Sequence, residues 1–361
     1  MDGLEKMKVE VNDILNIYEK EICKNTKNKK KLLNFERNKI TNIFDIVNII
    51  ENGNYHISKY NIFSIDKPKY RVIMSLNIKD KVINHYVARY ILLNKLDKYL
   101  DIRNCATRKN MGYDYAIKLV KKYLEIMKKN DEIYALKIDI SKYFYSINHN
   151  ILKGLLVDKL DKKEYEIVSN IIDSTDENYI NNSISNMKER LIIKDKNRSK
   201  EIKELPLYKK GYGLPIGNMT SQFLSIFYLY KLDHYIINNL HLKYMIRYMD
   251  DYIIFSNDKN YLKNCYYIIS SMMKKEYDLK INSKKSMIVN ASNSFEYLGY
   301  IFKIDNLKTI IKVRKANKKR REKNIKTNNY LYKKGYISYS SYFNSMNNYS
   351  NCYKYDKYMF R

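Results

Sequence analysis

The chain has 361 residues, with 68 Lys or Arg against 39 Asp or Glu, so its formal net charge is +29. This length allows two or three domains with a substantial core, and the low glycine and proline content excludes collagen-like and disordered classes. The charge favours a polyanionic partner, nucleic acid above all. Because Lys, Asn, Ile and Tyr are abundant and Ala is rare, an AT-rich genome is an alternative source of the lysines.

No apolar stretch reaches the length of a membrane span, and the N-terminus lacks a signal peptide's apolar segment. We therefore expect a cytoplasmic location with no membrane association. The four cysteines are scattered, so a zinc site or disulfide framework is not expected. The five histidines form no His-Glu-x-x-His helix. Any metal is therefore expected to be held by carboxylates, which suits magnesium.

The first half of the chain is predicted to be mainly helical. Residues 1 to about 58 read as a polar helical extension, and a short strand is expected at 70–74. Apolar residues at helical spacing predict helices at 80–99 and 113–128. A mostly buried strand follows at 133–140.

The second half alternates helices with hairpins. A polar stretch at 175–203 predicts an insertion or mobile loop, and a turn at Gly213 leads into a long amphipathic helix to about 239. The remaining predicted elements are a hairpin at 244–256, a helix at 260–276, a strand at 278–290, a hairpin at 295–302 and two basic or aromatic helices, at about 310–330 and from 335 onward.

The sequence Tyr248-Met249-Asp250-Asp251 places two carboxylates inside an apolar strand pattern. Two unit charges about 4 Å apart repel by roughly 4 kcal/mol at an effective dielectric of 20, and a divalent metal would turn this cost into a binding site. The alternative is a solvent-exposed hairpin turn. Strand alternation sends the two side chains to opposite faces. Both ligate only if a tight turn re-aims one, which ranks Asp251 below Asp250.

A third carboxylate, Asp139, lies near the end of a second strand pattern, at 133–140. If the strands that carry Asp139 and Asp250 are sheet neighbours, the two side chains meet at the strand ends. Three carboxylates can hold two Mg²⁺ ions roughly 3.5–4 Å apart, the arrangement used for in-line displacement at phosphorus. The sequence therefore predicts a site for phosphoryl transfer, in which the protein supplies position and field.

Five ordered motifs between about residues 67 and 302 resemble the reverse transcriptase series. They are Asp139 to Phe144, Gly213-Leu214-Pro215-Ile216-Gly217-Asn218-Met219-Thr220-Ser221-Gln222, Tyr248 to Asp251, Asn282-Ser283-Lys284-Lys285 and Tyr297-Leu298-Gly299. The second motif and Cys105-Ala106-Thr107-Arg108-Lys109-x-x-Gly112 most resemble diversity-generating retroelement or group II intron-like reverse transcriptases of bacteria or phages, and the diversity-generating retroelement enzymes above all. Retron and group II intron enzymes usually have Gln where this chain has Ile216 and Ser-Pro where it has Ser221-Gln222.

The resemblance implies an α+β right-hand polymerase. It places an N-terminal helical extension at 1–58, fingers at 59–132, a palm with an antiparallel sheet at 133–308, a finger or loop insertion at about 175–212 within it, and a small basic helical thumb at 309–361. No RNase H, integrase or endonuclease domain is expected. The implied reaction is RNA-directed addition of dNTPs to a primer 3′-end with two Mg²⁺ ions, or Mn²⁺. The implied partners are an RNA template, a DNA or RNA primer and a small basic accessory protein.

The resemblance also carries over site residues. The metal ligands would be Asp139, Asp250 and Asp251, together with Ile140. Lys285 matches the lysine proposed as general acid toward pyrophosphate, with Lys284 as the alternative. The residues implied in dNTP binding are Lys69, Arg71, Arg108, Phe144, Ile216, Gly217 and Gln222, and the turn Tyr297, Leu298 and Gly299 would seat the primer.

Several of these assignments have a physical rationale. A ring at Phe144 would collide with a 2′-hydroxyl and favour dNTPs, although Tyr143 competes for this role and an ordinary core Phe is the alternative. The Arg108 guanidinium suits phosphate oxygens, whereas Lys69 is equally a surface lysine. Ile216 offers an apolar surface in place of the family's Gln, which predicts reduced base selectivity because polar contacts discriminate more strongly than apolar fit.

The basic C-terminal helix would follow the template–primer backbone, and tyrosines could stack on bases; solvated charge runs and core tyrosines are the alternatives. Three other functions stay open: a retron or phage-defence (abortive-infection) reverse transcriptase, a palm-fold nucleotide cyclase and a non-catalytic nucleic-acid-binding protein. The Tyr-x-Asp-Asp sequence and the Leu298-Gly299 turn argue against the cyclase. The presence of all three acidic residues argues against the non-catalytic protein.

Overall fold

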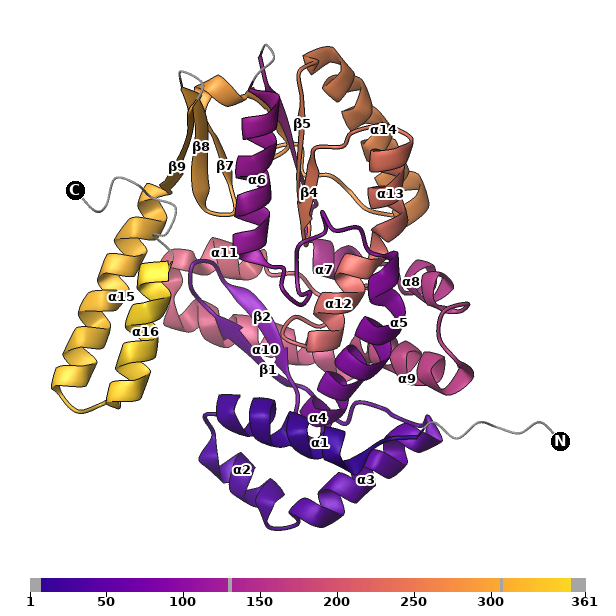
Figure 1. Ribbon diagram of the computed structural model, residues 1–361. Coiled ribbons are helices and arrows are strands. Elements are labelled where there is room, and N and C mark those ends of the chain that lie inside the picture. Colours follow the sequence, from indigo (N-terminus) through magenta and orange to yellow (C-terminus); the bar gives the residue numbers. More distant parts are fainter. Residues whose placement is uncertain (1–7, 129–131, 306–307, 352–361) are drawn as a thin grey trace. The chain divides into compact units, whose positions relative to one another are not determined.

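The computed structural model describes residues 8–128, 132–305 and 308–351 (Figure 1). The chain divides into two compact units. The first contains Met1–Arg108, Ile140–Tyr235 and Ile269–Ile281, and the second contains Lys109–Asp139, Ile236–Ile268 and Asn282–Arg361. Among the described residues, no helix combines the length and the apolarity needed to cross a membrane.

The first unit opens with the predicted helical extension. Its elements are α1 (Val11–Ile17), η1 (Tyr18–Cys23), α2 (Lys29–Glu36) and α3 (Lys39–Asn52). Although the segment is polar in composition, α3 buries Ile43, Ile46, Val47 and Ile50 along one face. The extension packs against α4 (Ile78–Tyr86) and is therefore part of the unit's core.

A two-stranded antiparallel ribbon follows, formed by β1 (Asn61–Ile65) and β2 (Arg71–Ser75). β2 confirms the strand predicted at 70–74. β1 is not predicted, because none of its residues is fully buried and its alternation is weak. The helix predicted at 80–99 is confirmed as the continuous helical run α4, η2 (Val87–Leu93), α5 (Asn94–Leu96) and η3 (Asp97–Tyr99).

The stretch at 175–203 is helical, so the prediction of a loop is wrong. It contains η4 (Ser174–Asp176), α10 (Asn178–Lys194), η5 (Lys196–Arg198) and α11 (Ser199–Lys203). Ile180 and Ile184 of α10 lie in one hydrophobic cluster with Val72 and Met74 of β2. Most residues of α10 are polar, so its composition does not indicate a packed helix. Its buried face consists of apolar residues four positions apart.

The rest of the first unit is helical. It contains α7 (Tyr143–Ser146), α8 (His149–Leu156), α9 (Lys162–Asp173) and α12 (Met219–Tyr228), with parts of α13 (Tyr230–Asn238) and α14 (Lys259–Tyr277). The long helix expected to end near 239 is therefore two helices, interrupted at Leu229. α14 confirms the helix predicted at 260–276.

The second unit is built on a four-stranded antiparallel sheet in the order β4-β5-β3-β6. Its strands are β3 (Tyr134–Asp139), β4 (Met245–Tyr248), β5 (Asp251–Ser256) and β6 (Met287–Asn290). The helix α6 (Tyr113–Met127) confirms the prediction at 113–128 and packs against β4 (Figure 1). The strand predicted at 278–290 is confined to β6, because the residues at 283–285 form a turn.

A three-stranded sheet and two helices complete the second unit. The strands are β7 (Phe295–Tyr297), β8 (Tyr300–Asp305) and β9 (Lys308–Val313), after the short helix η6 (Ala291–Asn293). The helices are α15 (Lys315–Lys333) and α16 (Tyr339–Asn351). The predicted start of a helix at 310 is wrong, because the β-branched residues before Arg314 pair with β8. α16 confirms the second helix, with Tyr342 stacked on Tyr332 of α15 at 4.6 Å between ring centroids.

We expect Ile184→Ala to destabilise the protein by about 2–5 kcal/mol, because it leaves a cavity in the core between α10 and β2. The matched control is Ile193→Ala on the same helix, whose side chain is 76% exposed and should change stability by less than about 0.5 kcal/mol. Urea unfolding measures both. Equal effects of the two substitutions would show that α10 is not packed as described.

Candidate active site

The catalytic candidates Asp250 and Asp251 lie at the turn of the β4–β5 hairpin. Tyr248 pairs with Asp251 across the turn, so Met249 and Asp250 are its two central residues. Met249 has a φ of 58°, and a positive φ at the first central position is the type II′ pattern, which usually uses Gly. Holding a Met there costs on the order of 1–3 kcal/mol. Because Asp250 lies in this turn, strand alternation does not govern its direction.

Asp139 and Asp251 are direct cross-strand neighbours, because the last residue of β3 pairs with the first residue of β5. Such pairs share one face of the sheet, with Cβ atoms about 4.5–5.5 Å apart. The predicted convergence of Asp139 with the Asp-Asp pair is therefore present in the second unit. The arrangement differs from the expectation that Asp139 meets Asp250 and that Asp251 is the less certain ligand. Asp251 is the cross-strand partner of Asp139, and Asp250 lies next to them in the turn.

The turn before β6 supplies polar partners to Asp139. Lys285 Nζ lies 2.8 Å and 3.1 Å from the two carboxylate oxygens of Asp139, and the Asn282 amide donates to Oδ2 at 2.9 Å. The Asp139 backbone N–H donates to the Ser286 hydroxyl at 3.1 Å. The geometry thus selects Lys285 over Lys284 as the lysine at the carboxylates. Its hydrogen bond to Asp139 raises the pKa of Lys285, which keeps it charged.

The negative charges of Asp139, Asp250 and Asp251 repel one another. Burial, reinforced by the charges of Asp250 and Asp139, raises the pKa of Asp251 from its ordinary 3.8 to about 7, while Lys285 and Lys137 oppose the rise. Three converging oxygen donors with excess negative charge fit a hard divalent cation. Among the described residues, the one set of three such ligand atoms within 4.8 Å of one another belongs instead to His149, Asp173 and Asp176. The palm carboxylates are therefore spaced more widely.

The predicted primer-grip turn lies on the β7–β8 hairpin of the same unit. Leu298 and Gly299 have φ values of 47° and 78°. A Cβ on Gly299 would lie 2.5 Å from Asn317 Nδ2, so the Asn317 side chain would have to move, and the φ of +78° would strain any other residue at this position. The Tyr297 hydroxyl donates to the backbone carbonyl of Asp251 at 3.2 Å. Tyr297 thus joins the predicted primer-grip turn directly to β5, the strand that begins at Asp251.

Four predicted dNTP-binding residues of the first unit are each at least partly accessible. Phe144 and Ile216 are half-buried, and Gly217 and Gln222 are exposed. Tyr143, the competitor of Phe144, is only 2% exposed and donates its hydroxyl to the Ser225 carbonyl, so it is a core residue. A Cβ on Gly217 would lie 3.1 Å from Ile73 Cγ2, at a φ of +112°. Their contact with a nucleotide stays a prediction.

The three basic residues predicted to bind the dNTP differ in their exposure. Lys69 and Arg71 are exposed, as a triphosphate ligand requires. The Arg108 side chain is 7% exposed, and its guanidinium donates to the Asp97 carboxylate at 2.6 Å and 3.2 Å and to the Asp101 carbonyl at 2.7 Å. Arg108 therefore stabilises the segment that contains Asp97 and Asp101. To bind a triphosphate, as predicted, its guanidinium would have to exchange these contacts for phosphate oxygens. Ile140 is buried and pairs with Ile281 by a β-bridge; its role in metal binding also stays a prediction.

Two residues of the second unit were not predicted. Arg247 is fully buried in β4, and its guanidinium donates to the Met249 carbonyl at 3.2 Å. This hydrogen bond stabilises the strained turn that contains Asp250. In the sequence, Arg247 could have been singled out because it is a charged residue inside a buried strand. Tyr113 of α6 packs its ring against both Tyr248 and Tyr300, which joins the two hairpins; nothing in the sequence distinguishes it from the other tyrosines.

Residues 57–302 match the family model described as reverse transcriptase (RNA-dependent DNA polymerase). Apo telomerase from Candida tropicalis, truncated from its C-terminal domain, has a TM-score of 0.51 and 17% identity, with 71% of this chain and 55% of that chain covered. A second structure of apo telomerase from this organism has a TM-score of 0.48 and 16% identity, with 70% of this chain and 47% of that chain covered. No curated protein matches the sequence.

Antiparallel strands that bring Asp139 to the Asp250-Asp251 turn, beside the β7–β8 hairpin, define the palm of a right-hand polymerase. Because the family model covers more than half of the chain, the protein belongs to the reverse transcriptase family. The likeness to the truncated telomerase concerns the fold. The chain spans about half the length of these telomerases.

The raised pKa of Asp251 predicts a stability that depends on pH. Between its ordinary value of 3.8 and about 7, the folded protein keeps a proton that the unfolded chain has lost, so stability falls as pH rises through this window. Asp251→Asn removes the free-energy cost of holding a buried negative charge at this position. In urea unfolding with chelator present, this variant should be more stable than wild type by up to a few kcal/mol at pH 8, at about 1.4 kcal/mol per unit. The difference should shrink toward pH 4.

The control for this prediction is Asp66→Asn, on the exposed loop between β1 and β2. It should show no comparable pH-dependent gain. A constant difference between Asp251→Asn and wild type at every pH would contradict the electrostatic description of the carboxylates.

Proposed function

We propose that the protein is an RNA-directed DNA polymerase that extends a primer 3′-end with dNTPs. The observation that carries this proposal is the pairing of Asp139 with Asp251 beside the turn that holds Asp250, in a chain of the reverse transcriptase family. The exposed residues Lys69 and Arg71 would bind the triphosphate. Phe144, accessible where Tyr143 is not, would exclude a 2′-hydroxyl.

Asp139, Asp250 and Asp251 would hold two Mg²⁺ ions, or Mn²⁺, because their oxygen donors suit hard cations. The ions, when bound, would lower the pKa of the primer hydroxyl and neutralise charge on the leaving pyrophosphate. Lys285 balances Asp139 in the structure, so it is placed at the carboxylates and stays protonated at neutral pH. From there it would donate a proton to the pyrophosphate oxygen.

The proposed nucleic-acid partners are an RNA template and a DNA or RNA primer. None of the residues of α15 is buried, and the helix carries a dense series of Lys and Arg. Such a surface would bind the phosphate backbone without sequence preference and with strong salt dependence. The small basic accessory protein and the cytoplasmic location remain proposals that follow from the resemblance alone.

Primer extension on an RNA template with Mg²⁺ tests this function. We expect Asp250→Ala to reduce the rate by at least about 100-fold, the loss typical of removing one essential electrostatic group. Asp158→Asn, on a carboxylate whose side chain is 69% exposed in the first unit, should leave the rate unchanged. Equal rates for wild type and Asp250→Ala would exclude the proposed function.

We further propose that the enzyme copies its template with low fidelity, as in a diversity-generating retroelement. The support is Ile216, whose backbone carbonyl accepts from the Met74 N–H at 3.0 Å, so the main chain is fixed and the side chain sets the local chemistry. An apolar surface discriminates between bases less than a polar contact. A retron or phage-defence enzyme would share the chemistry but lack a template repeat and variable copy beside its gene.

Ile216→Gln should therefore lower misincorporation, by roughly tenfold if the new contact contributes about 1.4 kcal/mol to discrimination. Sequencing the extension products measures this. Ile193→Gln, at an exposed isoleucine of α10, is the control and should leave the error spectrum unchanged. An error spectrum that is the same in Ile216→Gln and wild type would dispose of the fidelity proposal while leaving the polymerase activity standing.

A further inference from the structure

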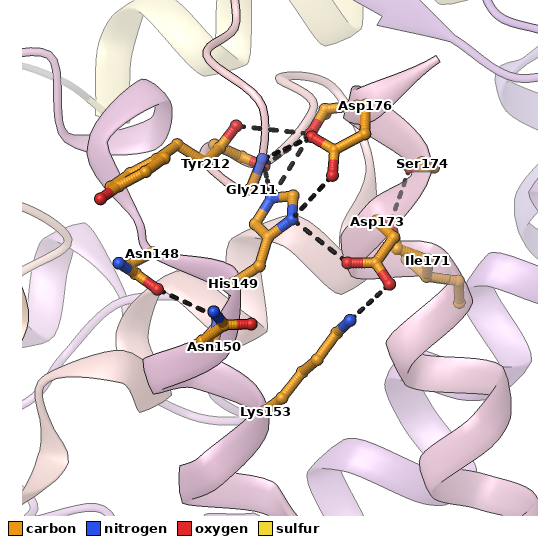
Figure 2. Close-up of polar contacts among 12 residues, drawn as sticks. Asn148, His149, Asn150, Lys153, Ile171, Asp173, Ser174, Asp176, Gly211 and Tyr212 are labelled. Atoms are coloured by element: carbon orange, nitrogen blue, oxygen red, sulfur yellow. Dashed lines mark hydrogen bonds and ion pairs between the residues drawn. The ribbon is translucent and has the colours of Figure 1, made fainter.

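His149, Asp173 and Asp176 converge in the first unit (Figure 2). His149 is the first residue of α8, Asp173 is the last residue of α9 and Asp176 ends the short helix η4 that follows. The two aspartates are three positions apart, so their side chains share one side of the helical run. One ligand atom from each of the three residues lies within 4.8 Å of the others.

The imidazole of His149 is fixed in one orientation. Its Nε2 lies 2.8 Å from the Gly213 carbonyl oxygen, and because a carbonyl only accepts, Nε2 carries the hydrogen. In the neutral ring, Nδ1 therefore presents a lone pair. Nδ1 is buried, in a residue that is 1% exposed, and it has no hydrogen-bond partner. It points toward the two carboxylates, as Figure 2 shows.

The distances around Nδ1 suit metal ligands better than hydrogen bonds. Asp173 Oδ1 lies 3.3 Å and Asp176 Oδ2 lies 3.7 Å from Nδ1. Hydrogen bonds from N–H to O usually measure about 2.7–3.2 Å. By contrast, two ligands of one tetrahedral ion with bonds of about 2.0–2.2 Å lie roughly 3.3–3.6 Å apart. A bare nitrogen facing two acceptors at these separations leaves room for a cation between them.

Each of the three side chains is also oriented by a second hydrogen bond or ion pair, made by an atom other than the one that faces the centre of the cluster. The Gly211 N–H donates to Asp176 Oδ1 at 2.8 Å, which leaves Oδ2 toward His149. Lys153 binds Asp173 Oδ2, which leaves Oδ1 toward His149. The hydrogen bond from the second imidazole nitrogen to a carbonyl is the usual support of a metal-bound histidine. The aspartates are partly exposed, at 44% and 24% of their side chains, so an ion and a water molecule have access.

We propose that His149 Nδ1, Asp173 Oδ1 and Asp176 Oδ2 bind one divalent transition-metal ion, with Zn²⁺ as the preferred ion and water as the fourth ligand. One imidazole nitrogen and two carboxylates suit zinc rather than magnesium, so this site differs from the palm carboxylates in the ion it selects. The expectation that carboxylates alone would hold metal is revised by this proposal.

The ion would have a structural role. Asp176 accepts a hydrogen bond from the Gly211 N–H. The Gly213 carbonyl accepts hydrogen bonds from His149 Nε2 and from the Thr175 hydroxyl, the latter at 3.0 Å. A metal that joins these side chains would fix the loop from Gly211 to Gly213, directly before Ile216 and Gly217. Binding to the folded state alone would also raise the melting temperature. The site does not depend on the proposed polymerase activity.

The full-length protein, stripped with chelator, is titrated with Zn²⁺ in excess Mg²⁺, which occupies hard carboxylate sites. We expect one tightly bound Zn²⁺ per chain, a rise in melting temperature on binding, and a tetrahedral absorption spectrum with Co²⁺. His149→Gln keeps a donor for the Gly213 carbonyl and removes the Nδ1 ligand, so Zn²⁺ affinity should fall more than about 100-fold, beyond the effect of losing a supporting contact.

Two further variants make the result decisive. His85→Gln is the matched control, because His85 Nδ1 also faces a carboxylate but at the 2.8 Å of an ordinary hydrogen bond to Glu21; its Zn²⁺ affinity should equal that of wild type. Asp176→Asn retains an acceptor for Gly211 and serves if His149→Gln does not fold. The proposal is overturned if wild type binds no stoichiometric Zn²⁺, if both site variants bind as tightly as wild type, or if ¹⁵N NMR shows His149 protonated on both nitrogens with Zn²⁺ present.

Discussion

The repulsion between Asp139 and Asp251 is the constraint on which the second unit depends. The antiparallel register places these carboxylates opposite each other at the end of the sheet, and the adjoining turn adds Asp250. Such a cluster persists only where positive charge and rigid backbone hold it. Lys285 supplies charge from the turn before β6, while Arg247 and Tyr297 fasten the backbone of the catalytic hairpin. The strand order β4-β5-β3-β6 is what brings these residues together.

The chemistry of this site could be predicted from sequence because Asp139 and the Asp250-Asp251 pair interrupt apolar strands, where charges are unfavourable. The relative placement of Asp250 and Asp251 could not, because it depends on the positive φ of Met249, and turn geometry with a non-glycine residue leaves no compositional signal. Arg108 illustrates another limit. A guanidinium that suits phosphate suits a carboxylate equally, and the contact with Asp97 is visible only in the fold.

Helices and strands with strong apolar periodicity, such as α6, α14 and β3, were predictable, whereas α10 and β9 were not. α10 buries only a few isoleucines beneath a polar surface, so composition favoured a loop. The lysines of β9 continue those of α15, so the charge pattern favours a helix there, although the β-branched residues of β9 pair with β8. The cluster at His149 escaped prediction because its aspartates lie far along the chain from the histidine. Local motifs therefore reveal chemistry more readily than tertiary convergence does.

The most direct measurement is a carboxyl ¹³C NMR titration of Asp251, assigned by comparison with Asp251→Asn. Without divalent cations, the carboxyl group should titrate with a pKa of about 7, because burial and the neighbouring carboxylates disfavour its charge. Added Mg²⁺ should move the titration to lower pH, since the cation competes with the proton. A midpoint near the ordinary 3.8, unaffected by Mg²⁺, would contradict the account of a converged carboxylate site.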